Sequence, residues 1–312
     1  MKVLVVPTIR ETSLKKFLDL WLKVEHWDEI IIVEDNPHKS FDVPFEHHYS
    51  WNEIEYELGF ASWIISKRDS AIRSFGFLKA HQIGAKYIFT LDDDCLPCEG
   101  QKFCEEHIKN LEETPKWTDS VLGFRTRGLP YQNFGKMNNV AFSMGLWEGV
   151  PDLDAIHMLT NHTEPLILPK TRIMPKNQYF PFCGMNFAFK REFAVLTYFP
   201  LMGKNSPFGR FDDIWFGIIC KKICDHLDLA ITVGEPYIYH SKASNAFDNL
   251  VKEAPGIKFN ETFWKIVDSI KLDGKSPTFC MKEIGAGLLS NEDDYISRLG
   301  KALDIWANHF KD

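Results

Sequence analysis

The spacing of apolar and polar residues divides the N-terminal part of the chain into alternating strands and helices. Short apolar, β-branched runs predict buried strands, and they occupy residues 2–9, 29–36 and 86–94. Apolar residues recur at helical spacing over 11–27 and again over 66–84, where Ser66 and Asp69 stand in capping-box spacing. Strands that alternate with helices in this way predict βαβ units and a mainly parallel sheet.

The middle of the chain has a looser pattern. Gly, Pro and aromatic residues crowd segments 123–151 and 175–211, which indicates long loops with short strands. A helix is predicted over 212–227, and its first turn carries Asp212 and Asp213, where the helix dipole favours acids. This region therefore predicts functional loops beside one well-defined helix.

The last part of the chain predicts one or two strands and a final amphipathic helix. The strands fall within 230–244, and the helix runs from Ser290 to about His309. No stretch has the composition of a linker. We therefore predict one α/β domain over residues 1–265, with a C-terminal helical extension, residues 266–312, packed on it.

Charge and composition exclude several classes of protein. The 312 residues carry a formal net charge of -7, so the basic surface that nucleic-acid binding requires is absent. No apolar run approaches the ~18 residues of a membrane-spanning helix. The N-terminal apolar run is too short for a secretory signal. The seven cysteines lack the spacing of a zinc site, which favours free thiols in a reducing cytoplasm.

Three consecutive carboxylates follow the third predicted strand. Alternate residues of an extended segment point to the same side, so Asp92 and Asp94 converge while Asp93 faces away. Two carboxylates at the carboxyl edge of a sheet suit Mg²⁺ or Mn²⁺ on a diphosphate. The alternative is a solvated acidic turn. Asp35 ends the second strand, where it either binds uridine or ribose or holds a turn.

The order of these acids resembles that of GT-A glycosyltransferases, which combine an Asp-x-Asp motif with a later acidic pair and a histidine. Asp212 and Asp213 supply such a pair, and His240 is either a further metal ligand or a structural residue. Longer stretches then resemble the reversibly glycosylated polypeptide family, the UDP-arabinopyranose mutases. They cover roughly residues 1–265, whereas residues 268–312 match weakly. The stretches are "LDDDCLP", "RGLPY", "SMGLWEGVPDLDA", "FPFCGMNFAF", "GRFDDIW", "KKICDHL" and "PYIYHSKASN".

The resemblance implies a GT-A fold, a UDP-sugar substrate, a divalent metal and a cytosolic location. It also implies a reaction that interconverts the pyranose and furanose forms of UDP-arabinose. The family is reversibly glycosylated on an arginine that matches Arg127 in "TRGLP". The family's second arginine, seven residues later, is replaced here by Phe134, so Lys136 or Arg125 must substitute or the activity differs.

Further residues are candidates for the site. Arg127 is either the covalent sugar acceptor or a clamp on the diphosphate. Because its guanidinium is protonated at neutral pH, accepting the sugar requires a base. Asp212 or Asp213 is that candidate, although the helix dipole stabilises its anion. The other candidates are Arg68 and Arg73 for phosphate, Gly184 for close backbone approach, Asn186 for a sugar hydroxyl, and Trp147 for a wall against water. For each of them, the alternative is an ordinary role at the surface or in the core.

Three functions are compatible with these residues. The first is the UDP-sugar mutase. The second is a metal-dependent glycosyltransferase with an external acceptor, which needs the same acids and is favoured by Phe134. The third is a non-catalytic partner of such an enzyme, against which the intact acids and Arg127 count. The sequence leaves open the sugar and the oligomeric state, a homo-oligomer included.

Overall fold

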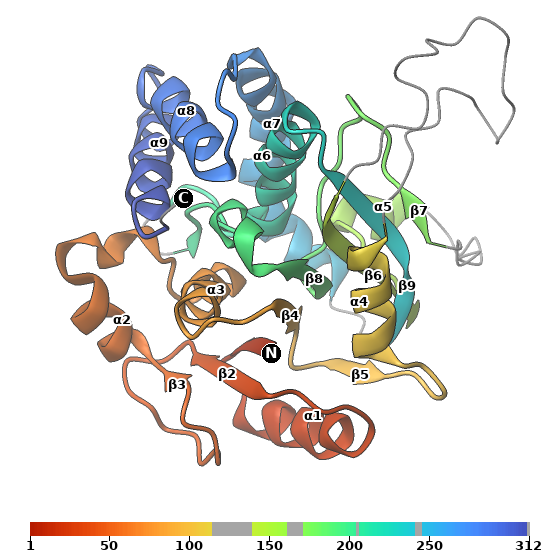
Figure 1. The fold of residues 1–312 in the computed structure, drawn as a ribbon. Helices are drawn as coiled ribbons and strands as arrows, with labels where there is room; N and C mark the ends of the chain where they lie inside the picture. The colour runs from red at the N-terminus through yellow and green to blue at the C-terminus, as the bar shows by residue number, and fades with distance from the viewer. Residues whose placement is uncertain (114–138, 161–170, 204–205, 241–244, 311–312) are drawn as a thin grey trace, which may run out of the picture.

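In the described part of the chain, nine strands form one sheet through the middle of the molecule (Figure 1). The structure is a computed structural model, and it describes residues 1–113, 139–160, 171–203, 206–240 and 245–310. The strands are β1 (Lys2–Thr8), β2 (Glu29–Glu34), β3 (His48–Tyr49), β4 (Tyr87–Leu91), β5 (Cys95–Pro97), β6 (Val140–Gly149), β7 (Arg172–Ile173), β8 (Asn186–Lys190) and β9 (Ala230–His240). Their order is β3-β2-β1-β4-β8-β6-β9-β5, and β7 also pairs with β9.

The N-terminal half of the sheet is parallel, as the sequence predicts. β1 lies between β2 and β4, with Val5 opposite both Ile31 and Thr90. β1 and β4 are buried almost throughout, which explains why they read as continuous apolar runs. The carboxyl ends of these strands meet at one edge of the sheet, where the chain continues into Arg10, Asp35 and the three carboxylates.

The second half of the sheet is mixed, and it brings the end of β9 beside the acidic segment. β8 is antiparallel to both β4 and β6, whereas β9 runs parallel to β6. β5 follows the three carboxylates and pairs antiparallel with β9, so that Cys95 lies opposite His240. This register places His240 close to Asp94, although the two residues are far apart in the sequence.

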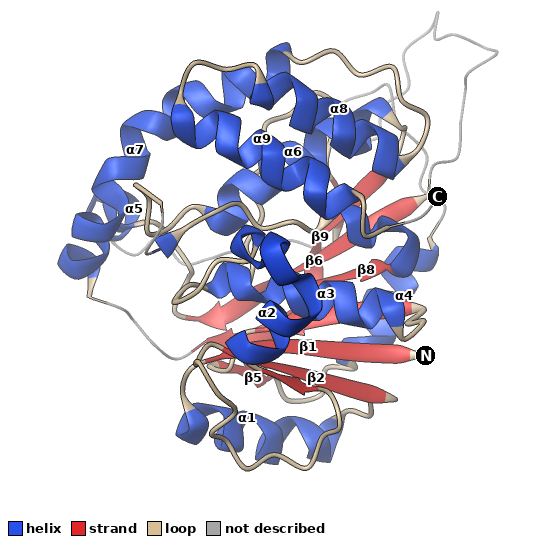
Figure 2. Ribbon diagram, turned by 90° about the vertical axis from the view of Figure 1, so that its left-hand side faces the viewer, coloured by secondary structure: helices blue, strands red, loops and turns tan. Residues whose placement is uncertain are grey.

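Helices cover both faces of the sheet (Figure 2). They are α1 (Glu11–Val24), α2 (Trp51–Leu58), α3 (Arg73–Gln82), α4 (Phe103–Glu112), α5 (Ala155–Thr160), α6 (Asp212–His226), α7 (Ala246–Ser269), α8 (Pro277–Leu289) and α9 (Asp294–Ala307). α1 and α4 share one face, where the rings of Trp21 and Phe103 are 4.9 Å apart. α3 and α6 cover the other through Phe77, Phe199 and Phe216. This α/β architecture, with a mostly parallel sheet flanked by helices, is consistent with the predicted GT-A-like fold.

The C-terminal region contains three helices where the sequence predicted one. α7 includes Pro255 and Gly256, which usually interrupt helices and therefore hid it from the pattern. α9 begins after Asp293, whose side chain caps it, whereas Ser290 follows the end of α8. The predicted domain boundary at residue 265 falls inside α7.

These helices pack on the sheet domain rather than standing apart from it, and Figure 1 shows α7, α8 and α9 gathered with α6. The Tyr295 hydroxyl donates to the Leu201 carbonyl at 2.9 Å, and the Trp306 indole donates to the Val195 carbonyl at 2.8 Å. α7 has 24 residues but is not apolar enough to cross a membrane. Every other helix of the described residues also lacks the combination of length and apolarity that a membrane span needs.

The helix predicted over 66–84 begins later than the sequence indicates. α3 starts at Arg73, after a short 3-10 turn. The Asp35 carboxylate accepts the backbone N–H groups of Arg68 and Asp69, each at 2.9 Å, and Arg68 has a left-handed φ of 62°. Arg68 therefore lies in a turn, and only Arg73 lies on the helix that was predicted to carry both.

Candidate active site

A cavity of about 670 Å³ opens at the carboxyl edge of the sheet, and we call it the strand-end cavity. Its walls come from the segment after β4, the loop before β8, the first turn of α6 and the end of β9. Eight of the residues predicted for the site lie on this wall: Arg73, Asp92, Asp94, Trp147, Gly184, Asp212, Asp213 and His240. The fold thus brings together residues from widely separated segments.

Asp93 and Asp94 lie in a turn in which the Cys95 N–H donates to the Asp92 carbonyl at 3.0 Å, so the extended segment that the sequence predicts ends before them. Asp92 and Asp94 line the strand-end cavity, whereas Asp93 is buried and accepts a hydrogen bond of 2.6 Å from the Thr8 hydroxyl. Arg10 bonds to both Asp93 and Asp94, and it reaches Asp94 at 2.9 Å. The side chain of Asp94 is still 24% exposed, so a ligand in the cavity can reach it.

His240 has the tautomer that a metal ligand needs. Its Nδ1 donates to the backbone carbonyl of Val150 at 2.9 Å, because a carbonyl only accepts. The lone pair of Nε2 is thereby left for another partner, as in many histidines that bind metals. The carboxylates of Asp92 and Asp94 and the imidazole of His240 are ligand types that a divalent ion accepts, and all three line the strand-end cavity. Among the described residues, however, these three do not form a group with ligand atoms within 4.8 Å of one another.

Arg73 is an internal clamp at the end of the sheet. Its side chain is 1% exposed and donates to Asp92 at 2.5 Å. It also donates to the Ser70 carbonyl at 3.0 Å and to the Gly184 carbonyl. The guanidinium therefore lies at the cavity wall with most of its donors already used by the protein.

Asp212 and Asp213 start α6 and point to different partners. Asp212 accepts a hydrogen bond of 2.5 Å from the Ser70 hydroxyl. Asp213 accepts the backbone N–H of Gly184 at 2.9 Å and that of Ile214 at 2.8 Å. The first turn of α6 is thereby tied both to the segment before α3 and to the loop before β8.

Desolvation controls the charge of this acidic pair. Burial, followed by the carboxylates of Asp212 and Asp152, raises the pKa of Asp213 to about 8. Burial also raises the pKa of Asp212, although Ser70 and Arg73 favour its anion. The helix dipole favours the anions of both acids, whereas desolvation and neighbouring carboxylates favour their protonated forms. Asp213 can hold or release a proton near neutral pH.

Asp152 and Cys183 also belong to the site, although neither was predicted from the sequence. The Cys183 thiol donates to Asp152 at 3.0 Å. The possible ligand atoms of Asp152, Cys183 and Asp213 lie within 4.8 Å of one another, so this group could also hold a metal ion. Both residues stand in stretches that carry the family resemblance, but no sequence spacing pairs them with Asp213.

A smaller pocket of about 250 Å³ adjoins the strand-end cavity, and Arg73 and Asp92 line both. Asp35 and Arg68 lie on its wall. Asp35 accepts the Trp51 indole N–H at 2.8 Å as well as backbone N–H groups, so it holds a turn. The Arg68 guanidinium lies 5.1 Å from the centre of the Trp51 ring.

Asn186 does not reach the strand-end cavity. It is fully buried at the start of β8, and its amide donates to the carbonyls of Leu146 and Pro236, each at 3.1 Å. Its side-chain oxygen lies 3.1 Å from Nε2 of His107. The side chain faces α4 rather than the cavity, so the predicted contact with a sugar hydroxyl is not supported.

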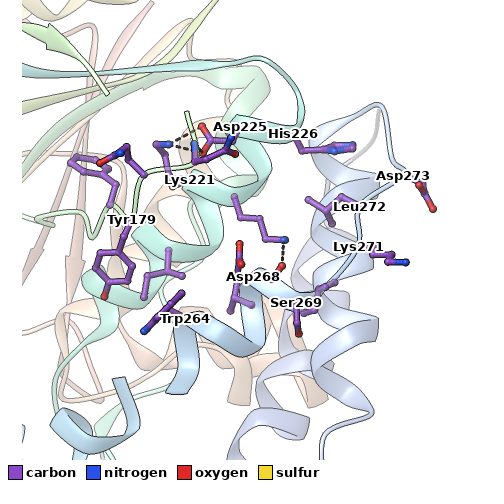
Figure 3. Close-up of a pocket in the computed structure, with 17 residues that line it drawn as sticks. Tyr179, Lys221, Asp225, His226, Trp264, Asp268, Ser269, Lys271, Leu272 and Asp273 are labelled. Carbon is purple, nitrogen blue, oxygen red and sulfur yellow. Dashed lines mark hydrogen bonds and ion pairs between the residues drawn. The ribbon is translucent and has the colours of Figure 1, made fainter. Parts of the chain in front are cut away.

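A larger cavity, of about 780 Å³, lies between α6 and the end of α7 (Figure 3). Figure 3 shows Lys221 directed at Asp225, to which it donates at 2.6 and 2.7 Å. Lys222 donates to the carbonyl of Asp268, and His226 donates to another carbonyl. Because the protein itself satisfies these groups, we assign the candidate chemistry to the strand-end cavity, where the acids converge.

The candidate sugar acceptor, Arg127, lies outside the described residues, as do Arg125, Phe134 and Lys136. The structure therefore shows neither the contacts of this arginine nor what replaces the family's second arginine. Both roles of Arg127, acceptor and clamp, stay predictions.

Comparison with known proteins identifies the family. The model of the family described as reversibly glycosylated polypeptide matches residues 2–312. UDP-arabinopyranose mutase 1 of Arabidopsis thaliana is 38% identical, over 97% of this chain and 90% of its own length. A Solanum tuberosum protein named probable UDP-arabinopyranose mutase 1 is 37% identical, over 97% of this chain and 88% of its own length.

The fold and the cavity define an α/β protein with an acidic ligand site at the carboxyl ends of its parallel strands. More specifically, the chain belongs to the reversibly glycosylated polypeptide family. The family match continues to residue 312, beyond the residues 1–265 on which the predicted resemblance rests. The C-terminal helices are thus part of what the family shares.

Proposed function

We propose that this protein is a UDP-sugar mutase that interconverts UDP-arabinopyranose and UDP-arabinofuranose. Relatives that match almost its whole length carry the name UDP-arabinopyranose mutase. The observation that carries the proposal is the strand-end cavity, which combines Asp92 and Asp94 with Asp213, whose pKa is raised to about 8. The reaction needs both functions, because a diphosphate must be retained while protons move at the sugar.

Asp92, Asp94 and His240 are the residues that would hold Mn²⁺ or Mg²⁺. The cavity wall carries three Arg or Lys side chains and eight Asp or Glu side chains, of which Asp69, Asp152, Asp212 and Asp213 have raised pKa values. A cation would offset the repulsion between the remaining acids and the diphosphate. When bound, the ion would neutralise the diphosphate and help it to depart. Asp152, Cys183 and Asp213 are an alternative donor set on the same wall.

The nucleoside would occupy the smaller adjoining pocket. Arg68 borders this pocket and keeps its side chain near the Trp51 ring. Asp35 holds the backbone of the same turn in place. The diphosphate would then cross from this pocket into the strand-end cavity beside Asp92, which lines both.

Arg127 is proposed as the sugar acceptor, with Asp213 as its base. A guanidinium nitrogen bonds to C1 of the sugar as the bond between C1 and UDP breaks, and the proton it loses passes to a carboxylate. Asp213 suits this task because, with a pKa of about 8, it is a stronger base than an ordinary aspartate. After the sugar ring recloses through a different hydroxyl, the reverse step returns the sugar to UDP. Otherwise, Arg127 only clamps the diphosphate.

The apolar wall of the cavity would protect this chemistry from water. Trp147 and Phe182 line the cavity and are 8% and 3% exposed. Water at C1 would convert the substrate to free arabinose, so a mutase must exclude it.

We also infer a cytoplasmic location, because all seven cysteines are free thiols, as is usual in a reducing compartment.

The test is to incubate the purified protein with UDP-arabinofuranose and Mn²⁺ and to separate the nucleotide-sugars by chromatography. We expect UDP-arabinopyranose to appear. The variant Asp213→Asn keeps the side-chain volume and removes the base, so it should convert at least 100-fold more slowly. Release of UDP and free arabinose, or unchanged substrate, would contradict the proposal.

The role of Arg127 has its own test, which uses UDP-sugar labelled in the sugar. The variant Arg127→Ala should no longer acquire label, because the accepting nitrogen is gone. Arg125→Ala is the matched control and should still be labelled. If Arg127→Ala is labelled like the unmodified protein, Arg127 is not the acceptor and only the clamp role is left.

A glycosyltransferase with an external acceptor is the second candidate. The replacement of the family's second arginine by Phe134 favours it, because Lys136 or Arg125 would have to substitute for that arginine in a mutase. A product larger than the UDP-sugar, formed when a glycan or protein acceptor is added, would establish this activity.

A further inference from the structure

Phe211 has an unusual backbone conformation directly before the acidic pair. Its φ of 94° and ψ of 6° lie in the left-handed region, which a bulky side chain rarely adopts. Phe211 is the residue before α6, and Asp212 and Asp213 follow it. Such conformations persist only where the surrounding structure enforces them, and they cluster at functional sites.

The ring of Phe211 is held between two helices. It is 7% exposed and stacks on Trp215 of α6, with ring centres 5.4 Å apart. The same ring also approaches Gly256 of α7. A Cβ atom added at Gly256 would be 2.5 Å from Cε2 of the Phe211 ring and 2.6 Å from Cδ2, so only glycine leaves room for this ring.

Helix formation does not explain why position 256 is a glycine. Glycine is unfavourable in the interior of a helix, and Gly256 lies in the middle of α7. The close contact with the Phe211 ring explains it. The slot at Gly256 thus couples a C-terminal helix to the first turn of α6.

We propose that Phe211 is a positioning residue, which the slot at Gly256 holds so that Asp212 and Asp213 face the strand-end cavity. This inference rests on the proposed function for its effect on rate, but not for its effect on geometry. The geometric consequence is the contact between the Asp213 carboxylate and the Gly184 N–H, which is 2.9 Å here. If the ring is displaced, the backbone turn relaxes and Asp213 leaves Gly184.

Phe211 also lines the cavity, so a direct contact with the sugar is the rival role. Gly256 separates the two roles because it does not line the cavity. The variant Gly256→Ala should lower kcat by about 10- to 100-fold, since small misplacements of catalytic groups have effects of this size. Its KM and its affinity for UDP with Mn²⁺ should stay within about two-fold, because the substrate contacts are intact.

Two further variants complete the experiment. The double variant Gly256→Ala with Phe211→Leu should regain most of the lost kcat, since the smaller side chain makes room for the new methyl group. Gly287→Ala is the control, because its Cβ would crowd Ile270 at 2.8 Å, away from the cavity. It should keep the original kcat.

Crystal structures of the variants test the geometry whether or not the protein is a mutase. In Gly256→Ala, the distance from Asp213 to the Gly184 N–H should exceed hydrogen-bonding range, and the double variant should restore it. If Gly256→Ala does not fold, Phe211→Ala alone, which removes the ring from the slot, should show the same separation. An unchanged contact, or a change in KM alone, would overturn the positioning role. Absence of mutase activity in the unmodified protein would instead refute the proposed function.

Discussion

At the scale of single residues, burial sets the charge of the strand-end cavity. It raises the pKa of Asp69, Asp152 and Asp213, so each of these acids keeps its proton at a pH at which an exposed aspartate has lost it. Neighbouring carboxylates add to this effect. Binding of a cation at Asp152 or Asp213 would release these protons, so metal affinity should rise with pH.

Asp213 makes the stability of the metal-free protein depend on pH. Its pKa rises from an ordinary 3.8 to about 8 on folding, so the folded protein binds this proton more tightly than the unfolded chain. The stability that the group contributes is therefore fully present below its unfolded pKa and is lost as pH rises to about 8. Asp213→Asn should be more stable at pH 8 by about 1 to 3 kcal/mol, with a shallower decline. Urea unfolding at several pH values, with EDTA present, measures how stability changes with pH in the unmodified protein and in Asp213→Asn. Equal slopes of stability against pH would contradict the burial argument.

Asp94 should control the dependence of UDP binding on metal. Asp94→Asn keeps the shape of the side chain and removes its charge, so the gain in UDP affinity on adding Mn²⁺ should disappear in calorimetry. Asp93→Asn is the matched control, because this carboxylate is buried against Thr8 and Arg10. It should lower stability but leave the metal dependence intact. An Asp94 variant that still responds to Mn²⁺ would move the metal to another set of ligands.

At the scale of elements, the contact of α6 with the segment before β8 decides which residues meet. A Cβ atom at Gly217 would lie 2.2 Å from the backbone nitrogen of Phe182, so the helix packs directly on this segment. The close approach lets the Gly184 N–H reach Asp213 and brings Cys183 to the same wall. A larger residue at position 217 would separate the acidic pair from the cavity.

Asn186 should act in stability rather than in sugar binding. Asn186→Ala leaves the carbonyls of Leu146 and Pro236 and the ring of His107 without this partner. We expect the free energy of unfolding to fall by about 2 to 4 kcal/mol in urea titrations. Asn308→Ala, on the exposed end of α9, should change it by less than about 0.5 kcal/mol. A large rise in KM for the UDP-sugar, with little loss of stability, would restore the sugar contact.

At the scale of the whole molecule, the C-terminal helices complete the core of the α/β domain. Trp306 is fully buried, and its ring packs against that of Tyr198 at 5.4 Å. Through Gly256 the same region reaches the first turn of α6. The division into a domain of residues 1–265 and a separate extension therefore has to be tested by removing the extension.

A chain that ends at Ile270 should not fold cooperatively, because it exposes the surface that α8 and α9 cover. The milder variant Trp306→Ala should lower the free energy of unfolding by about 3 to 5 kcal/mol. Lys301→Ala, on the exposed side of α9, is the control and should have little effect. Circular dichroism during urea unfolding measures all three. A shortened chain of nearly full stability would show that residues 1–270 fold independently of α8 and α9.

The sequence by itself determined the features that depend on local patterns. The buried strands appear as apolar runs because both of their faces are covered, and helix 212–227 appears through its apolar spacing. The position of three carboxylates directly after a buried strand is also visible in the sequence, but their directions depend on the turn closed by the Cys95 N–H and on Thr8 and Arg10. The family resemblance also depended on contiguous stretches of sequence.

Only the tertiary structure decided the features that depend on contacts between distant segments. The pKa of Asp213 depends on burial and on Asp152, and neither is visible in the residues beside it. The inward direction of Asn186 and the turn at Arg68 likewise depend on partners far away in the chain. Desolvation and packing are properties of the assembled fold, so local sequence predicts which acids are present but not which of them carries a proton.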